Sequence, residues 1–154
     1  MKLAVGTWRL AVALRVGIFC CLLPTAYCQL ACSLPNLEKP QCTAARDTVK
    51  RFYSFHFGND MRPSPENLKA RVQFLTNELS GSLSTSTETV KDYFTATDNY
   101  PKAFRVGSCT SESDDKAILQ VLLLWRDDVK SEQKEVHVET VKVADKWLIN
   151  KVSN

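Results

Sequence analysis

Apolar and polar residues follow two different periods along the chain, and the period changes near Phe104. Between Thr43 and Leu83, apolar side chains recur every three or four residues, the spacing of one face of an α-helix. From Phe104 onward, apolar and polar residues alternate, as they do in β-strands. The sequence therefore predicts an α+β fold, with N-terminal helices packed on a curved antiparallel sheet of about four strands.

The first predicted helix begins at an N-cap, Thr43, and ends at Gly58. Its stripe at helical spacing consists of Ala45, Val49, Phe52, Tyr53 and His56. The preceding residues include Pro35 and Pro40 and have no periodicity. Residues 29–42 are therefore predicted to form a tether.

Two further helices are predicted before the sheet. Ser64 is an N-cap and Pro65 takes the first helical position, where its missing N–H removes no helix hydrogen bond. The apolar face of this helix comprises Leu68, Val72 and Leu75. Thr76 caps a shorter helix that runs through Leu83. Serines and threonines in residues 80–89 compete for backbone hydrogen bonds, so a loop there is the alternative.

Four strands are predicted, at residues 104–109, 117–126, 135–144 and 147–152. Their connections are short and polar, which favours an antiparallel meander. The second strand has apolar residues on both faces, so both faces are predicted to be covered. In the third strand the apolar positions change phase at Thr140, which predicts a β-bulge there and a curved sheet with the helices in its concave face.

The first 28 residues have the pattern of an export signal, and residues 1–28 are predicted to be a signal peptide. They contain no acidic residue and three basic ones, and their apolar run at 16–23 is shorter than the roughly 20 residues that cross a membrane. Cleavage between Cys28 and Gln29 is one alternative. The other is lipidation of Cys32, which would attach the protein to a membrane only through a lipid anchor. We expect an exported protein, periplasmic or secreted.

Removal of the signal peptide changes the charge of the chain. All 17 acidic residues lie after it, whereas three of the 20 basic residues lie within it, so the mature chain has no net charge. A nucleic-acid-binding protein is expected to have a basic face, which this balance disfavours. The rest of the chain is long enough for a single domain, predicted at residues 43–154.

Three cysteines remain after the predicted cleavage: Cys32, Cys42 and Cys109. An odd number in an oxidising compartment predicts one disulfide and one cysteine with another fate. We expect Cys42 to pair with Cys109, closing a long loop whose constraint would stabilise the fold by about 4 kcal/mol. The alternative is a local bond between Cys32 and Cys42.

Four segments of the chain carry a family resemblance. They are AARDTVKRFYSFHF, FLTNEL, DYFTATDNYP and KWLINKVS. They resemble the nuclear-transport-factor-2-like (cystatin-like) superfamily, and within it a bacterial exported family of unknown function. The resemblance covers residues 43–154 and implies a cone-shaped α+β fold whose open end can form a pocket.

The resemblance does not imply one activity. Enzymatic relatives such as steroid isomerases and polyketide cyclases use an Asp, a His or a Tyr in that cavity, whereas many secreted members are non-catalytic binding modules. No catalytic motif of those enzymes matches this chain residue by residue. The candidate chemistry therefore rests on individual side chains.

The two histidines, His56 and His137, lie on different predicted elements and share no metal-ligand spacing, so the sequence predicts neither a metal site nor a cofactor. His56 is expected to be a core or pocket-rim residue, with a general base as the alternative. His137 alternates with Glu139 as residues on a solvated strand face do.

The weak acid–base candidates are His56 and a polar-aromatic cluster formed by Asp92, Tyr93, Asp98 and Tyr100. A carboxylate beside a phenol in a cavity can move protons. The alternative is that Asp98 lies in an ordinary turn and Asp92 is exposed. The candidate contacts of a bound ligand are Tyr53, Phe57, Tyr93, Tyr100 and Trp125, with a place in the core as their alternative.

These patterns favour an exported, non-catalytic domain that binds a small apolar or amphipathic ligand, or a protein partner, in the pocket. An isomerase or dehydratase that pairs Asp92 or Asp98 with Tyr93 or Tyr100 is the second hypothesis. The third is a self-associating structural domain, a homodimer that forms through the second face of the sheet.

Overall fold

Helices precede strands along the chain, as the change of period predicts. In this computed structural model the described residues are 37–86, 91–126 and 131–154. The predicted signal peptide, its cleavage site and Cys32 lie outside them. The elements are α3 (Pro40–Phe57), α4 (Pro65–Arg71), the 3₁₀-helix η1 (Val72–Phe74), α5 (Asn77–Thr85), β1 (Ala103–Ser111), β2 (Lys116–Arg126), β3 (Ser131–Val143) and β4 (Lys146–Ser153).

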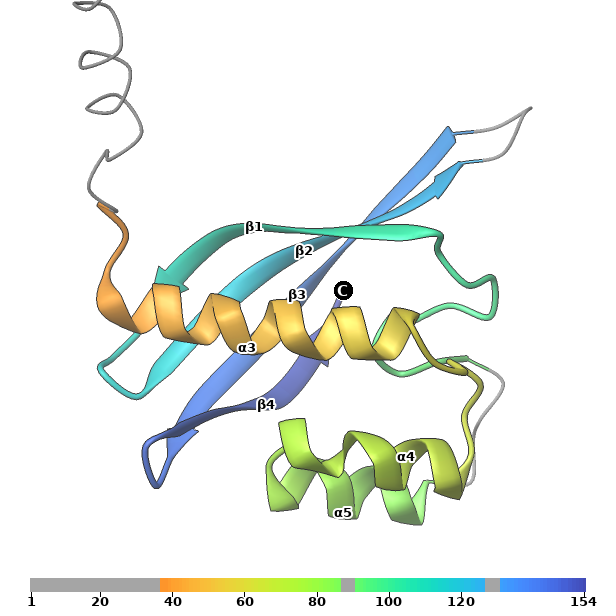
Figure 1. Cartoon of the computed structure of the whole chain (residues 1–154), viewed down its shortest axis with the longest axis horizontal. Coiled ribbons are helices and arrows are strands. Elements are labelled where there is room, and N and C mark those ends of the chain that lie inside the picture. The colour runs from red at the N-terminus through yellow and green to blue at the C-terminus, as the bar shows by residue number, and fades with distance from the viewer. Residues whose placement is uncertain (1–36, 87–90, 127–130) are drawn as a thin grey trace, which may run out of the picture. The chain divides into compact units, whose positions relative to one another are not determined.

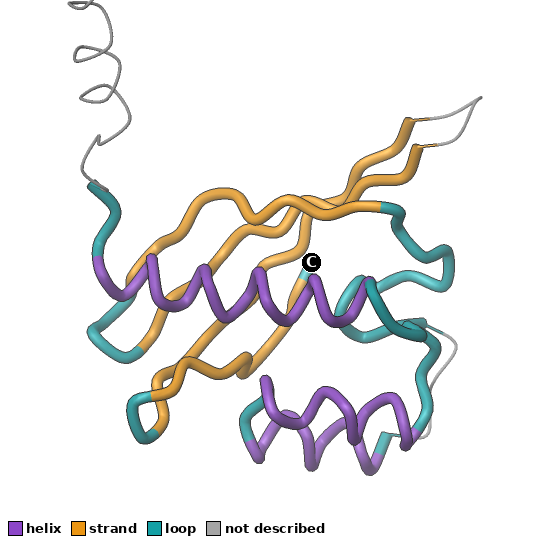
Figure 2. Tube along the Cα trace, viewed as in Figure 1, coloured by secondary structure: helices purple, strands orange, loops and turns teal. Residues whose placement is uncertain are grey.

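The four strands form one antiparallel sheet in the order β1-β2-β3-β4. The α+β class and the meander are therefore confirmed. Helix α3 lies across the sheet, and α4 and α5 lie side by side next to β4 (Figure 1). The described residues between α5 and β1 form a loop that passes the end of α3 (Figure 2).

Helix α3 begins four residues earlier than predicted, with Lys39 rather than Thr43 as its N-cap. Pro40 is the first residue of the helix, where its fixed φ suits the helix and its missing N–H would have no partner. Residues 40–42 therefore belong to α3 rather than to the tether. The predicted end is correct, because Gly58 is the C-cap.

The caps of the next two helices are confirmed. The Ser64 hydroxyl accepts from the Asn67 N–H at 3.1 Å, and the Thr76 hydroxyl accepts from the Leu79 N–H at 3.2 Å. Helix α4 is shorter than predicted: Leu75 lies beyond η1 and forms a parallel bridge with β4. Helix α5 continues to Thr85, so the loop alternative is wrong for residues 80–85; residues 87–89 lie outside the described part of the chain.

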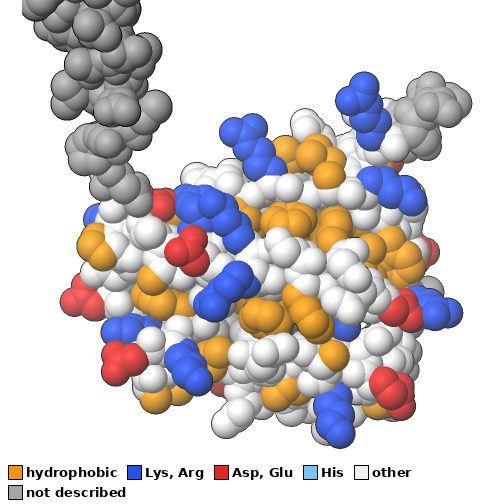
Figure 3. Space-filling model, viewed as in Figure 1, with side chains coloured by type: hydrophobic (Ala, Val, Ile, Leu, Met, Phe, Trp, Pro, Cys, Tyr) orange, Lys and Arg blue, Asp and Glu red, His pale blue; other side chains and the backbone are white. Residues whose placement is uncertain are grey.

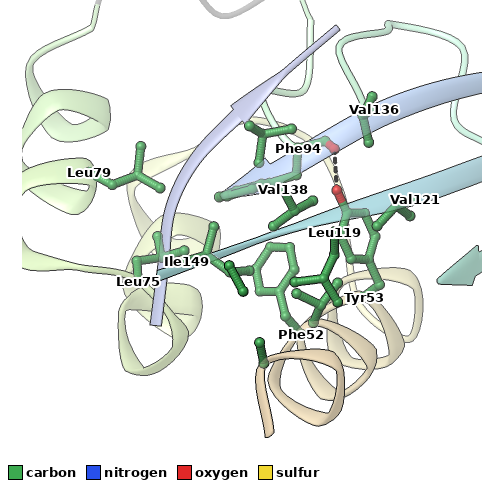
Figure 4. Close-up of a cluster of buried hydrophobic side chains, with 14 of the residues drawn as sticks. Phe52, Tyr53, Leu75, Leu79, Phe94, Leu119, Val121, Val136, Val138 and Ile149 are labelled. Atoms are coloured by element: carbon green, nitrogen blue, oxygen red, sulfur yellow. Dashed lines mark hydrogen bonds between the residues drawn. The ribbon is translucent and has the colours of Figure 1, made fainter. Parts of the chain in front are cut away.

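The apolar stripe of α3 packs against the inward face of the sheet. Phe52 and Tyr53 lie among Leu119, Val121 and Ile149, and all five are fully buried (Figure 4). Phe94, from the loop before β1, lies 4.7 Å from Phe52 between ring centroids and completes this core. The core therefore joins α3, the sheet and the 91–96 loop.

The prediction that both faces of β2 are covered is wrong. Its inward residues are fully buried, whereas Ile118, Leu122 and Leu124 on the other face are only half-buried. None of the described helices covers that face (Figure 1). The homodimer hypothesis stays a prediction.

A bulge lies where predicted, but in the neighbouring strand. Thr140 pairs with Ile149 and Glu139 pairs with Lys151, so the extra residue is Asn150 of β4. Strand β3 keeps its alternation through the buried Thr140, and its later valines face outward, with Val143 51% exposed. The phase change in β3 thus marks outward valines, not an extra residue.

The predicted disulfide between Cys42 and Cys109 is present, with Cα atoms 5.8 Å apart. It joins the first turn of α3 to β1. One turn further along α3, the Arg46 guanidinium donates to the carbonyls of Val106 and Gly107. These carbonyls lie at a second bulge, which the sequence did not predict, between Val106 and Cys109.

No helix in the described part of the chain combines the length and the apolar character needed to cross a membrane.

Candidate functional site

A cavity of about 960 Å³ lies at the α4–α5 end of the domain. Its walls come from α4 and the loop before it, the end of α5, the 91–96 loop and the end of β4. The apolar part of the lining includes Met61, Leu68, Val72, Leu83, Tyr93 and Val152. The volume falls within the range of about 300–1,000 Å³ that is usual for small-molecule sites.

A buried polar network forms one wall of this cavity. The His56 ring lies between two charged groups: its Nδ1 atom is 2.7 Å from Nε of Arg71, and its Nε2 atom is 3.0 Å from Oδ2 of Asp92. The exposed fractions of these residues are 1% for His56, 3% for Arg71 and 4% for Asp92. Arg71 and Asp92 line the cavity, and His56 lies behind them.

The network fixes the state of the histidine ring. An arginine Nε–H can only donate, so Nδ1 of His56 accepts and carries no proton. The ring proton is therefore on Nε2, which donates to Asp92. His56 is a neutral link between the guanidinium of Arg71 and the carboxylate of Asp92, and neither ring nitrogen is free.

One oxygen of Asp92 is saturated by this network and the other is not. Oδ2 accepts from His56, from the Thr95 N–H at 2.9 Å and from the Thr95 hydroxyl at 2.7 Å. Oδ1 has no hydrogen bond to any described residue. Every fully buried polar atom of the described side chains has a hydrogen-bond partner. Oδ1 has none, so it is not fully buried and reaches accessible space. Asp92 lines the cavity. A buried carboxylate thus offers one open acceptor to a ligand.

Arg71 is held from several sides. Its two terminal nitrogens donate to the carbonyls of Asn67, at 2.6 Å, and Asp60, at 2.7 Å. Burial lowers the pKa of its guanidinium, while the negative charge of Asp92 acts in the opposite direction. The Phe55 ring lies 5.9 Å from the guanidinium carbon. The position of Arg71 is therefore fixed by the fold.

Three further cations line the cavity. Arg62 pairs with Asp60 at 2.7 Å, and this contact holds the pKa of the exposed Asp60 carboxyl well below its usual range. Lys69 and Lys91 are exposed and have no ion-pair partner among the described residues. Asp92, already balanced by Arg71, is the only acidic side chain among the described lining residues. The described lining therefore has two positive side chains, Lys69 and Lys91, that no described acidic group balances.

Of the five predicted ligand contacts, the structure places Tyr93 in the cavity lining. Its hydroxyl oxygen accepts from the Val152 N–H at 3.2 Å. Tyr53 is fully buried, and its hydroxyl donates to the Phe94 carbonyl at 2.8 Å (Figure 4). Burial, with a smaller contribution from the charge of Asp92, raises the pKa of Tyr53 well above its ordinary value. Tyr53 therefore belongs to the core.

The other predicted contacts lie outside the described lining. Phe57 packs against Phe104, with ring centroids 5.2 Å apart. Trp125 donates from its indole nitrogen to the Asn99 carbonyl at 2.6 Å. Tyr100 is half-buried, and desolvation together with the charge of Asp92 raises the pKa of its hydroxyl.

Among the acid–base candidates, the structure brings His56 and Asp92 into contact and places Tyr93 in the same wall. Asp92 is buried, so the alternative that it is exposed is wrong. Asp98 is exposed and does not join the network. His137 is exposed on β3 and pairs with Glu135 at 3.2 Å.

One group of potential metal ligands lies among the described residues, formed by Glu38, Cys42 and Cys109. The two sulfurs are bonded to each other and offer no thiolate, and the Glu38 carboxylate pairs with Arg46. The donor set does not suit a metal ion.

Sequence reasoning missed Arg71 and Thr95 of the network and the lysines of the cavity. Arg71 directly precedes Val72 of the predicted apolar face, and an arginine on a helix is ordinarily solvated, so nothing local marked it. Thr95 had a signal, because a threonine three residues after an aspartate commonly bonds its carboxylate. Lys69 and Lys91 are brought to one cavity only by the fold.

Charged side chains are dispersed on one face of the domain (Figure 3). On the face that carries α3, lysines and arginines lie singly among apolar and acidic side chains (Figure 3).

No family model matches the sequence, and no curated protein matches it. Among solved structures, a protein described as "Ntf2 like protein involved in plasmid conjugation" aligns with a TM-score of 0.43 and 14% identity over 79% of this chain. The alignment spans 41% of that protein, so this chain covers less than half of its length. A protein of unknown function from Bacteroides thetaiotaomicron VPI-5482 aligns with a TM-score of 0.44 and 13% identity, over 74% of this chain and 88% of that protein. Likenesses of this degree say nothing about activity.

Proposed function

We propose that this domain binds a small amphipathic molecule in the α4–α5 cavity and does not transform it. The observation that carries this proposal is the composition of the lining: apolar side chains from α4, η1, α5 and β4 lie beside a wall with a fixed, buried carboxylate. Most ligand sites combine a mainly apolar surface with a few positioned polar groups in this way.

The network supports binding rather than proton transfer. Asp92 Oδ2 accepts three hydrogen bonds, so this oxygen is not open to a substrate. Both nitrogens of His56 are occupied. Among the candidate bases, an isomerase or dehydratase would therefore have to use Oδ1 of Asp92 alone, and Asp98, the other candidate carboxylate, is exposed outside the described lining.

The binding proposal is tested with a neutral apolar fluorophore, N-phenyl-1-naphthylamine, titrated against the protein. Val72→Trp and Leu83→Trp would each place a large side chain at the cavity, and we expect at least a tenfold loss of affinity. Val143→Trp is the matched control, because Val143 is also exposed but lies outside the cavity lining. Equal affinity in wild type and both cavity variants, with unchanged circular dichroism, would overturn the proposal.

We further propose that the protein is exported. The disulfide between Cys42 and Cys109 supports this, because such bonds persist in oxidising compartments. Mass spectrometry of the protein recovered from its host tests the proposal. A chain that begins at Gln29, or a diacylglycerol-modified chain that begins at Cys32, would support export, and a chain that retains residues 1–28 in the cytoplasm would contradict it.

A further inference from the structure

The proposed cavity has a chemical preference that its polar atoms define. Resting on the proposed binding function, we propose that the ligand is a hydroxylated anionic amphiphile. Its hydroxyl group donates a hydrogen bond to Oδ1 of Asp92, and its anionic group lies near Lys69 and Lys91. Its apolar chain contacts the lining between them.

The hydroxyl follows from the open acceptor in the wall. Asp92 is 96% buried and its Oδ2 atom is fully engaged, yet its Oδ1 atom reaches accessible space and has no partner among the described residues. An acceptor in low-dielectric surroundings favours a ligand that supplies a donor, because the unpaired atom otherwise loses its hydrogen bonds to water.

The donor is expected to be neutral. The buried network already contains one positive group, Arg71, and one negative group, Asp92, with a neutral histidine between them. A ligand ammonium at Oδ1 would add a second cation to a site whose charge is balanced, and its desolvation would be costly. A hydroxyl group donates without this cost.

The anionic group follows from the rest of the lining. Lys69 and Lys91 are exposed cations without an ion-pair partner among the described residues, and no other acidic side chain besides Asp92 appears in the described lining. Exposed lysines attract an anion while they stay hydrated, so the attraction should weaken with salt.

The test compares four twelve-carbon compounds by isothermal titration calorimetry: 12-hydroxydodecanoate, dodecanoate, 12-aminododecanoate and 1,12-dodecanediol. We expect 12-hydroxydodecanoate to bind at least about fivefold more tightly than dodecanoate, the gain of one well-made hydrogen bond. Without an acceptor in the wall the order would be reversed, because a methyl end is more favourably buried than a hydroxyl. The amino and diol compounds should each bind more weakly than the hydroxy acid.

Two double variants test the role of the lysines without altering the buried network. Lys69→Glu with Lys91→Glu should weaken the binding of 12-hydroxydodecanoate about tenfold and leave 1,12-dodecanediol unchanged. Lys102→Glu with Lys146→Glu is the control, because it makes the same change of net charge at exposed lysines outside the described lining. Equal weakening in both double variants would reduce the effect to net charge and overturn the anionic assignment.

The outcomes separate this inference from the binding proposal. Preference for dodecanoate or 12-aminododecanoate over the hydroxy acid overturns the hydroxyl assignment and leaves binding intact. If none of the four compounds binds while N-phenyl-1-naphthylamine still does, the ligand class is wrong and the cavity still binds apolar molecules. If neither the four compounds nor the fluorophore binds, both proposals fail.

Discussion

Among single residues, the two histidines differ most in their surroundings. His56 links Arg71 to Asp92 in the interior, whereas His137 lies on an exposed strand face beside Glu135. Replacement by alanine is therefore expected to affect stability differently at the two positions.

His56→Ala should lower the free energy of unfolding by about 3–5 kcal/mol, because it leaves a buried carboxylate and a buried guanidinium without their common partner. His137→Ala should change it by no more than about 0.5 kcal/mol, because exposed pairs contribute little. Urea unfolding of both variants at pH 7 measures the difference. Similar midpoints for the two variants would contradict the role assigned to His56.

The burial of Tyr53 predicts a loss of stability at alkaline pH. Burial raises its pKa in the folded protein well above the ordinary value of 10, so folding favours the neutral phenol. The resulting stabilisation is complete below about pH 10 and is lost as pH rises through the folded-state pKa, because the unfolded chain ionises first.

Tyr53→Phe should cost about 1 kcal/mol at pH 7, through the lost hydrogen bond to the Phe94 carbonyl. The variant should lose less stability than wild type between pH 9 and 11, because it lacks the ionising group. Chemical unfolding across this range checks both statements, and parallel declines in the two proteins would show that Tyr53 does not contribute to the alkaline loss.

The sequence predicted the positions of some of these side chains but not their contacts. The helical spacing placed His56 on the apolar stripe, and the structure buries it there. Its contact with Asp92 could not be predicted, because the two residues are 36 positions apart and meet through a loop without periodicity. The burial of Arg71 could not be predicted either, because its partners His56 and the Asp60 carbonyl lie on other segments of the chain.

Among the elements, α3 and β1 are linked by a covalent bond as well as by packing. The disulfide joins them, and Arg46 bonds the carbonyls at the β1 bulge while pairing with Glu38. A covalent bond and a charged side chain thus hold two successive turns of the helix against the same strand.

Replacing both cysteines, as Cys42→Ala with Cys109→Ala, should lower the free energy of unfolding by about 4 kcal/mol, as expected for a closed loop of this length. Dithiothreitol should lower the thermal midpoint of wild type toward that of the double variant, whose own midpoint should not respond. A wild-type midpoint unaffected by complete reduction would show that the bond adds no stability.

The elements themselves were largely predictable, because side-chain periodicity and caps are local properties. Ser64 and Thr76 bond the backbone as their sequence contexts suggested. The strand that contains the bulge was not predictable from one strand alone, because outward valines on β3 produce the same pattern as a shifted register. Register is a property of two strands, and the extra residue is Asn150 of β4.

At the scale of the whole molecule, the disulfide and the cavity lie at opposite ends of α3. Cys42 is in the first turn of the helix and His56 in the last, about 20 Å apart along its axis. Ligand binding and the disulfide should therefore stabilise the fold independently.

If 12-hydroxydodecanoate binds as proposed, a concentration one hundred times its dissociation constant should add about 2.7 kcal/mol to the stability. The gain should be the same in wild type and in the cysteine double variant, because the two effects arise at separate ends. Thermal scans with and without ligand test this. A gain confined to the disulfide-bonded protein would show that the two ends are coupled.

Helix α5 is held to the sheet by few groups, chiefly Leu79 and the bonds of its cap Thr76 to the Ile149 carbonyl and the Asn150 side chain, whereas α4 is tied to α3 through Arg71 and His56. The end of α5 is therefore expected to open while α4 and the α3 core stay in place, a local opening that needs less free energy than unfolding. In amide hydrogen exchange, the α5 amides should exchange faster than those of Val49 and Phe52, and with little dependence on denaturant. A loosely attached wall would give a ligand its way in.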